Sequence, residues 1–203
     1  MSIPLHAMTS FVEHIEEIGL VGYSPEELNM ILDTMLDQQT DLVVEWGTNI
    51  GQSARIFYEA REWLGLPCVI HSVEIQRELG PVWGYERGHW VKDLDVRLHI
   101  GDGVTRGVDL WHASGAHRPL FFLDDNHAES EVLRQLRMIA VEAPEAVMLI
   151  HDTHTPVYGN EIGASYWMLH EPGVAIQTFL KESPDYDYEE VLVGQCMVRL
   201  WPK

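Results

Sequence analysis

The sequence predicts an α/β fold with a seven-stranded, mostly parallel sheet and helices on both of its faces. Two observations predict it. Short apolar runs alternate with amphipathic helical patterns along most of the 203 residues, as they do in doubly wound proteins. The last two apolar runs are joined closely around Gly194 and Gln195, so they must pair as a hairpin. The hairpin adds one antiparallel C-terminal strand to the sheet.

The predicted strands are rich in Val, Ile, Leu and Phe, which is typical of strands buried on both faces. In chain order they cover residues 42–44, 68–75, 95–100, 120–123, 146–150, 188–193 and 196–201. Between them, residues 54–64, 104–112, 129–143 and 172–180 carry apolar residues at helical spacing. In such a sheet the carboxyl ends of the parallel strands meet at one edge, and ligands bind outside it.

Two further helices are predicted before the first strand, over residues 8–19 and 25–38. Ser24, Pro25 and Glu27 are the N-cap, first-turn proline and N3 acid of a capping box. We therefore divide the chain into a helical extension, residues 1–40, packed on the sheet, and a main domain, residues 41–203. The extension is either a cover on the sheet, which we favour, or a lid over a substrate.

The composition restricts the partners of the protein. Lys and Arg number 13 against 32 Asp and Glu, for a formal net charge of −19. Such a charge argues against nucleic acid or an anionic membrane as the main partner and favours a small molecule. No N-terminal charged-then-apolar signal and no membrane-length apolar run is visible, and Cys68 and Cys196 both lie in strand-like runs. We therefore expect a cytoplasmic protein with two reduced core cysteines.

The first strand leads into a glycine-bearing turn, residues 45–53 (EWGTNIGQS). A strand that turns through glycines into a helix leaves backbone N–H groups free and lets a ligand approach closely. The turn has neither the spacing of a dinucleotide fingerprint nor the Lys-Ser/Thr pair of a P-loop. Glu74 follows Gly51 by 23 residues, about the separation at which an acid meets a ribose diol. The alternative for the glycines is an ordinary tight turn that binds no ligand. The alternative for Glu74 is a solvated glutamate at the end of a strand.

Acids and histidines follow the next strands. The sequence Gly101-Asp102-Gly103 follows the third strand, residues 124–127 (DDNH) follow the fourth, and residues 151–154 (HDTH) follow the fifth. Asp124 and Asp152 therefore follow neighbouring strands, and their carboxylates could bind one hard cation such as Mg²⁺. The alternative is that both carboxylates only accept hydrogen bonds from loop N–H groups.

His127 and His154 are candidate general bases, although either can be structural. The aromatic segment 83–90 is either a pocket wall or a packed crossover.

These motifs resemble those of class I S-adenosylmethionine-dependent methyltransferases, which have a Rossmann-like sheet with one antiparallel C-terminal strand. The resemblance covers residues 41–201. Residues 122–127 (FLDDNH), 150–153 (IHDT) and 171–180 (EPGVAIQTFL) look like a narrower group of cephalosporin-hydroxylase-like, macrocin and catechol O-methyltransferase-like proteins. Many members of that group depend on a divalent metal.

The resemblance implies two sets of site residues. The implied cofactor-binding residues are Glu45, Gly47, Thr48, Asn49, Gly51, Ser53, Glu74, Ile75, Gly101, Asp102, Gly103 and Asp124. The implied metal ligands are Asp124 and Asp152, and we add His151 as the third. Mg²⁺ is the preferred ion, but a histidine ligand makes Mn²⁺, Fe²⁺ or Zn²⁺ an alternative. The candidate catalytic residues are His127, which also fits the histidine of that group, His154 and Asp124.

We therefore predict a metal-assisted, S-adenosylmethionine-dependent O-methyltransferase that acts on a small hydroxylated acceptor such as a sugar, a glycoside or a catechol-like ring. One alternative is a non-catalytic nucleotide- or cofactor-binding module. Another is an oxidoreductase or hydroxylase-like protein on the same fold, which the missing dinucleotide fingerprint disfavours. Exposed aromatic residues allow a homodimer.

Overall fold

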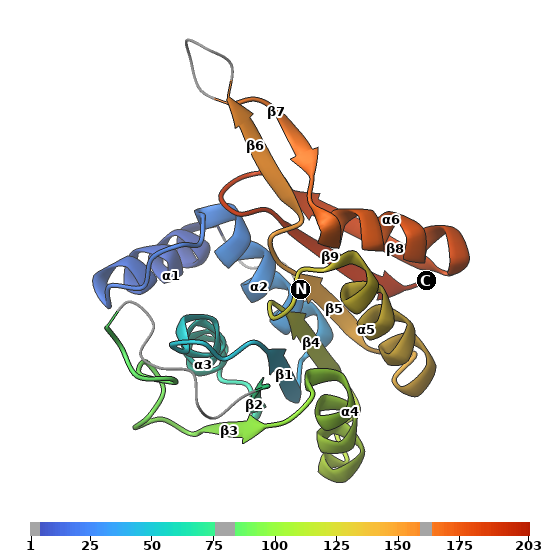
Figure 1. Cartoon of the computed structure of the whole chain (residues 1–203). Helices are drawn as coiled ribbons and strands as arrows, with labels where there is room; N and C mark the ends of the chain where they lie inside the picture. The colour runs from blue at the N-terminus through green and yellow to red at the C-terminus, as the bar shows by residue number, and fades with distance from the viewer. Residues whose placement is uncertain (1–4, 76–83, 159–163) are drawn as a thin grey trace.

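The computed structural model describes residues 5–75, 84–158 and 164–203, and it confirms the α/β fold (Figure 1). Seven strands form the main sheet in the order β3-β2-β1-β4-β5-β9-β8. Their bounds are β1 Leu42–Trp46, β2 Val69–Glu74, β3 Val96–Ile100, β4 Pro119–Leu123, β5 Val147–Ile150, β8 Tyr186–Val191 and β9 Met197–Pro202. Every strand of the predicted sheet is therefore present, within a few residues of the predicted bounds.

The register brings the parallel strands to a common edge. Trp46 at the end of β1 pairs with Val73 of β2 and with Leu123 at the end of β4. Leu123 in turn pairs with Ile150 at the end of β5. Strand β9 runs antiparallel to both β5 and β8, as the closely joined hairpin predicted.

Within the described residues, six helices are present, and they cover the main sheet on its two faces (Figure 1). They are α1 Leu5–Glu17, α2 Pro25–Gln38, α3 Gln52–Leu64, α4 Gly103–Ser114, α5 Glu129–Glu142 and α6 Glu171–Glu182. One buried cluster packs α1, α2 and α3 against one face, through residues such as Phe11, Ile31 and Phe57. The other packs α4, α5 and α6 against the opposite face, through Val104, Leu136 and Phe179. Each strand of the sheet centre is thus buried on both sides, which explains its continuous apolar sequence.

The N-terminal helices belong to the first of these two packed layers. Helix α2 begins with the predicted capping box: the Ser24 hydroxyl accepts from the Glu27 N–H, and the Glu27 carboxylate accepts from the Ser24 N–H. Phe11 of α1 and Ile31 of α2 are fully buried. The division at residue 40 stays a prediction.

A second sheet differs from the sequence-based prediction. Strands β6 (His154–Tyr158) and β7 (Ala164–Leu169) form an antiparallel ribbon that projects away from the main sheet (Figure 1). The sequence predicted a loop here because Pro156 and two glycines are typical of loops. A two-stranded ribbon has only edge strands, where proline is tolerated.

Both cysteines are buried and free, as predicted. In the part of the chain that the structure describes, no helix is both long and apolar enough to cross a membrane.

Candidate functional site

The strand ends are held together beyond the sheet by four backbone hydrogen bonds. Gly47 donates its N–H to the Val73 carbonyl over 2.9 Å, and Asp124 donates to Trp46 over 3.0 Å. His151 donates to Leu123 over 3.1 Å, and Gly101 to Glu74 over 3.0 Å. The first residue after each strand is therefore fixed against its neighbour, and the predicted turns and acids share one edge of the sheet.

Gly47 is required by this close approach. Its φ angle is 101°, a conformation that favours glycine. A Cβ atom at this position would overlap the carbonyl oxygen of Asp124. The glycine therefore lets the ends of β1 and β4 touch, which places Asp124 directly beside the loop.

One cavity of about 420 Å³ opens at the ends of β1, β2 and β4. Its lining residues are Gly47, Asn49, Val73, Glu74, Ile75, Arg87, Gly103, Asp124, Asp125 and Asn126. The Glu74 carboxylate accepts a hydrogen bond from the Asn49 N–H over 3.1 Å and pairs with Arg87 over 3.0 Å. We name it the Glu74 cavity. A carboxylate here, beside the apolar Val73 and Ile75 and the glycine turn after β1, could accept hydrogen bonds from both hydroxyls of a ribose.

Glu45 lies behind the loop and lines neither this cavity nor the larger one described below. Its fully buried carboxylate accepts hydrogen bonds from the Ser53 and Ser72 hydroxyls. Burial raises the pKa of Glu45 to about 8, against the lowering effect of the two hydroxyls. The side chains around it tie the turn after β1 to β2, because Thr48 also bonds to Ser72 over 2.6 Å.

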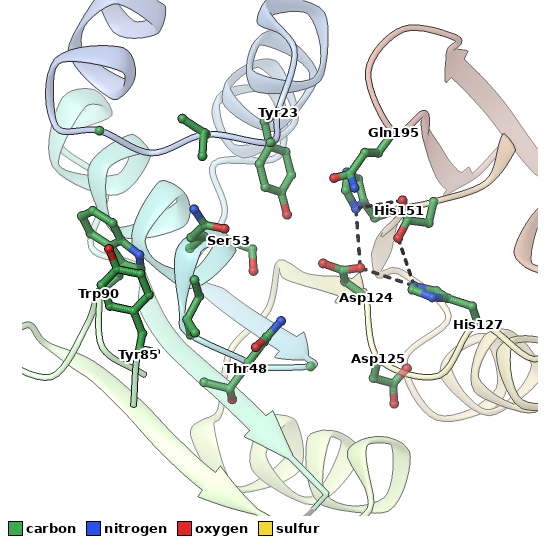
Figure 2. Close-up of a pocket in the computed structure, with 18 residues that line it drawn as sticks. Tyr23, Thr48, Ser53, Tyr85, Trp90, Asp124, Asp125, His127, His151 and Gln195 are labelled. Atoms are coloured by element: carbon green, nitrogen blue, oxygen red, sulfur yellow. Dashed lines mark ion pairs between the residues drawn. The ribbon is translucent and has the colours of Figure 1, made fainter. Parts of the chain in front are cut away.

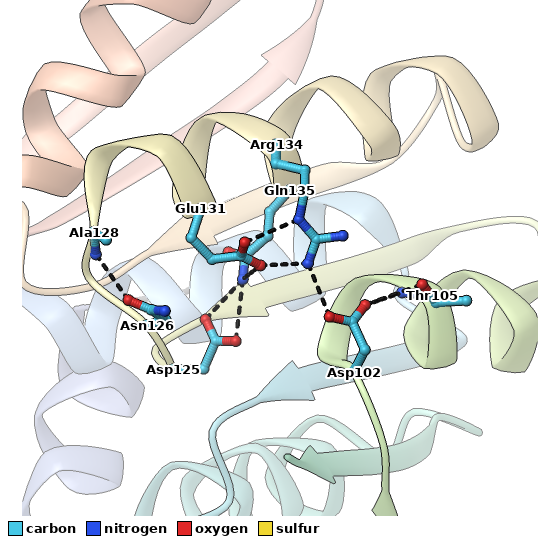
Figure 3. A network of polar contacts seen from close by, with 8 residues as sticks. All are labelled: Asp102, Thr105, Asp125, Asn126, Ala128, Glu131, Arg134 and Gln135. Carbon is cyan, nitrogen blue, oxygen red and sulfur yellow. Dashed lines mark hydrogen bonds and ion pairs between the residues drawn. The ribbon is translucent and has the colours of Figure 1, made fainter.

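Asp102 also has structural partners (Figure 3). It is the N-cap of α4, accepting from the Thr105 N–H over 3.0 Å, and it pairs with Arg134 of α5 over 2.9 Å. Burial opposes ionisation, but these contacts lower the pKa of Asp102. Of the three residues in this motif, only Gly103 lines a cavity. Gly51 likewise lines neither cavity and forms the N-cap of α3.

A larger cavity of about 540 Å³ lies beside the first and shares Gly47, Asn49, Asp124 and Asp125 with it. The other lining residues are Gly19, Val21, Gly22, Tyr23, Thr48, Ile50, Gln52, Ser53, Tyr85, Trp90, His127, His151, Asp152 and Gln195. Tyr85 and Trp90 stand across the cavity from Asp124 and His127 (Figure 2). The predicted aromatic segment therefore contributes two residues to a cavity wall, whereas Trp83 lies outside the described residues.

Asp124, His151 and Asp152 meet in this larger cavity, which we name the Asp-His-Asp cavity. One potential ligand atom from each of these side chains lies within 4.8 Å of the others. His151 Nδ1 is 3.5 Å from Asp124 Oδ1 and 3.9 Å from Asp152 Oδ1. His127 Nε2 lies 3.4 Å from Asp124 Oδ1 and 3.5 Å from Asp152 Oδ2. Asp152 takes a left-handed φ of 52°, which turns the chain after β5.

The carboxylates and imidazoles of the cluster shift one another's pKa values. Burial would raise the pKa of Asp124, but His127 and His151 hold it below its ordinary value. Burial raises the pKa of Asp152 despite His151. Burial would lower the pKa of His151, yet Asp124 and Glu27 raise it to about 10. The carboxylates of Glu27, Asp124 and Asp152 all lie within 3.9 Å of a His151 ring nitrogen.

These residues fit a divalent metal. The ring nitrogens of His151 are buried and, among the described residues, lie 3.5 Å or more from the carboxylates of Glu27, Asp124 and Asp152, so they form no hydrogen bond of ordinary length. His127 Nε2 is buried in the same way, 3.4 Å from Asp124. The separations of 3.4–3.9 Å exceed ordinary N–H···O distances. Ligand atoms that share one ion at about 2.1 Å lie roughly 3 to 3.5 Å apart. An imidazole with two carboxylates suits Mn²⁺, Fe²⁺ or Zn²⁺ at least as well as Mg²⁺.

His154 does not join the cluster. It begins β6, its Nδ1 lies 3.1 Å from the Thr153 hydroxyl, and it lines neither cavity. Burial lowers its pKa.

Four of the residues that sequence reasoning missed bear on the argument. Tyr23 and Gln195 line the Asp-His-Asp cavity, Arg87 pairs with Glu74, and Glu27 lies 3.5 Å from His151. The capping box already explained why a glutamate stands at position 27, so the sequence offered no reason to expect its contact with His151. The other three carried no local signal.

No protein-family model matches the chain, and no curated protein does. Solved structures with the same fold include the O-methyltransferase of tomaymycin synthesis from Streptomyces achromogenes, in complex with S-adenosylmethionine. It is 13% identical, with a TM-score of 0.57, over 100% of this chain and 92% of that one. A methyltransferase from Podospora anserina, bound to S-adenosylhomocysteine, is 15% identical, with a TM-score of 0.56, over 100% and 90%. An O-methyltransferase from Bacillus cereus, also in complex with S-adenosylhomocysteine, is 12% identical, with a TM-score of 0.52, over 100% and 93%.

The chain therefore has the class I S-adenosylmethionine-dependent methyltransferase fold. Within that class, its whole length aligns with structures of O-methyltransferases.

Proposed function

We propose that this protein is an S-adenosylmethionine-dependent O-methyltransferase that uses a divalent metal and acts on a small hydroxylated acceptor such as a sugar, a glycoside or a catechol-like ring. One observation carries the proposal: two adjoining cavities share Gly47, Asn49, Asp124 and Asp125. One cavity holds Glu74, the proposed acceptor for a ribose diol, and the other holds Asp124, His151 and Asp152, the proposed metal ligands. A methyl donor and an acceptor would meet where the two cavities join.

The Glu74 cavity is the proposed donor site. Glu74 would accept hydrogen bonds from the ribose hydroxyls, and Ile75 and Gly103 would border the adenine. Asn49 already fixes Glu74 through its N–H, so the carboxylate is oriented before the ligand arrives. Glu45 and Asp102 would contribute indirectly, by holding the loop after β1 and the start of α4.

The Asp-His-Asp cavity is the proposed acceptor site. Asp124, His151 and Asp152 would hold the metal, which supplies a Lewis acid that binds the acceptor hydroxyl and lowers its pKa. Tyr85 and Trp90, on the opposite wall, would pack on the ring of the acceptor.

His127 is the proposed proton acceptor, because it lines this cavity and His154 does not. When bound, S-adenosylmethionine would supply the methyl group, leaving as S-adenosylhomocysteine while the acceptor hydroxyl becomes a methyl ether. His127 Nε2 would take the hydroxyl proton. The protein contributes alignment of the two reactants and exclusion of water.

Calorimetry with S-adenosylhomocysteine, followed by assays with methyl-labelled S-adenosylmethionine, tests the proposal. The acceptor panel contains a catechol, a glycoside and a free sugar, each with and without a chelator. We expect binding, and transfer to at least one acceptor that stops with the chelator. Absence of S-adenosylhomocysteine binding would refute the donor site. Binding without transfer to any of these acceptors would favour a non-catalytic module.

A further inference from the structure

We infer that Glu27, on a helix that precedes the first strand, is a positioning residue for the metal site. It holds the Nε2 side of the His151 ring and so leaves Nδ1 as the atom offered to a divalent ion. This inference rests on the metal site of the proposed function. It adds a residue that is 124 positions from His151 in the sequence and that nothing in the strand-end motifs indicates.

Glu27 is fixed on several sides. Its side chain is fully buried, and Oε2 accepts the Ser24 N–H over 2.7 Å. Oε1 accepts the Gln195 N–H over 3.2 Å and lies 3.5 Å from His151 Nε2. A Cβ atom at Gly194 would overlap Glu27 Oε2. The carboxylate therefore cannot swing away from His151 without losing the backbone contacts of Ser24, at the start of its own helix, and of Gln195, 168 positions away.

The ring of His151 is restrained as tightly as its partner. Tyr23 stacks on it with 4.8 Å between ring centroids and 20° between planes. Phe122 packs near it at 6.1 Å. Only 2% of the His151 side chain is exposed. With the ring held in this way, Nε2 faces Glu27 and Nδ1 faces Asp124 and Asp152.

With 3.5 Å between Glu27 Oε1 and His151 Nε2, a carboxylate lies on the side of the ring where metal-binding histidines are usually supported, at a separation longer than an ordinary hydrogen bond. A ligating imidazole nearly always donates its second N–H to a carboxylate, a carbonyl or water, which fixes the ring and makes the free nitrogen a better ligand. Carboxylates lie on both sides of His151, but only Asp124 and Asp152 line the cavity. Glu27 does not line it, so its contact with His151 is the supporting one.

Zinc binding to the whole protein, measured by calorimetry, tests the inference with Glu27→Gln. The glutamine amide presents N–H groups in place of one carboxylate oxygen, so it cannot accept equally from Ser24, Gln195 and His151. We expect zinc affinity to fall about 10- to 100-fold while S-adenosylhomocysteine affinity stays unchanged. Unaltered zinc affinity in the variant would overturn the inference.

Two control variants separate positioning from stability. Glu59→Gln removes a comparable Glu–His contact, 2.8 Å from His14 and away from both cavities, and should leave zinc affinity unchanged. Ser24→Ala removes the hydroxyl that caps α2 but keeps the Ser24 N–H that Glu27 accepts. If Ser24→Ala weakened zinc binding as much as Glu27→Gln, helix capping and not positioning would be the cause.

A measurement on the unaltered protein does not depend on any variant folding. Long-range ¹H–¹⁵N correlation spectra of the zinc-loaded, ¹⁵N-histidine-labelled protein report which ring nitrogen keeps its proton. We expect His151 to keep a proton on Nε2 and to bind zinc through Nδ1. Coordination through Nε2 would contradict the inference. Methyl transfer by a protein that does not bind zinc would defeat this inference and count against the proposed metal site, but it would leave the donor site standing. Zinc binding through Nδ1 without S-adenosylhomocysteine binding would defeat only the proposed function.

Discussion

Arg87 pairs with Glu74 over 3.0 Å, and both side chains line the Glu74 cavity. The acid that we assign to the ribose therefore has a cationic partner before any ligand binds. Only 12% of the Glu74 side chain and 17% of the Arg87 side chain are exposed. A bound ribose must share the carboxylate with Arg87 and with the Asn49 N–H, so Glu74 is the central acceptor of this cavity.

Replacement of Glu74 by alanine should weaken S-adenosylhomocysteine binding by about 1–3 kcal/mol, because buried hydroxyls and Arg87 lose a charged partner. Calorimetry measures the loss, with Glu62→Ala, an exposed glutamate on α3, as the control. Equal affinities for the Glu74 variant and the unaltered protein would refute the ribose assignment.

Replacement of Asp152 by alanine should abolish methyl transfer and leave S-adenosylhomocysteine affinity nearly intact. Of the two cavities, Asp152 lines only the Asp-His-Asp cavity, and its loss would remove one of the three proposed ligands of the ion. Turnover is compared with and without a chelator, and Asp109→Ala on the exposed surface of α4 is the control. The metal mechanism fails if the chelator leaves the turnover of the unaltered protein unchanged.

Replacement of His127 by glutamine should lower kcat by about 10²- to 10⁴-fold, the usual contribution of a general base. The KM for S-adenosylmethionine should stay the same, since His127 lines only the acceptor cavity. The matched change His154→Gln, outside both cavities, should leave kcat within a small factor. A larger loss from His154→Gln than from His127→Gln would reverse our assignment.

Glu45 gives a prediction about stability and pH. Burial raises its pKa from 4.5 to about 8 in the folded state, so between these values the folded protein holds a proton that the unfolded chain releases. The free energy of unfolding should therefore fall as pH rises through this window, by up to about 1.4 kcal/mol per pH unit. Below the window both states are protonated and the effect vanishes.

Urea unfolding of the unaltered protein and of Glu45→Gln between about pH 5 and pH 8 measures this contribution. Glutamine does not ionise, so the variant should lose stability less steeply as pH rises. Parallel slopes for the two proteins would show that Glu45 does not hold its proton in the folded state.

The sequence by itself determined the sheet and its ligand-binding edge. Apolar runs such as residues 120–123 are buried on both faces, so their composition marks them as central strands. Each is followed by a turn or an acid, and the parallel register then brings Gly47, Glu74, Asp124 and Asp152 to one rim. The sequence also predicted the capping box of α2, because that contact lies within four residues.

Only the tertiary structure decided which of these side chains line a cavity. Glu45 and Asp102 follow strands just as Glu74 does, yet their carboxylates are taken by serine hydroxyls and by the start of a helix. The contacts of Glu27 with His151 and with the Gln195 N–H, the latter spanning 168 positions, exist only once the helical layer packs on the sheet. Local sequence patterns report the backbone that each residue prefers, whereas the direction of a side chain and its partner depend on segments that meet only in the folded protein.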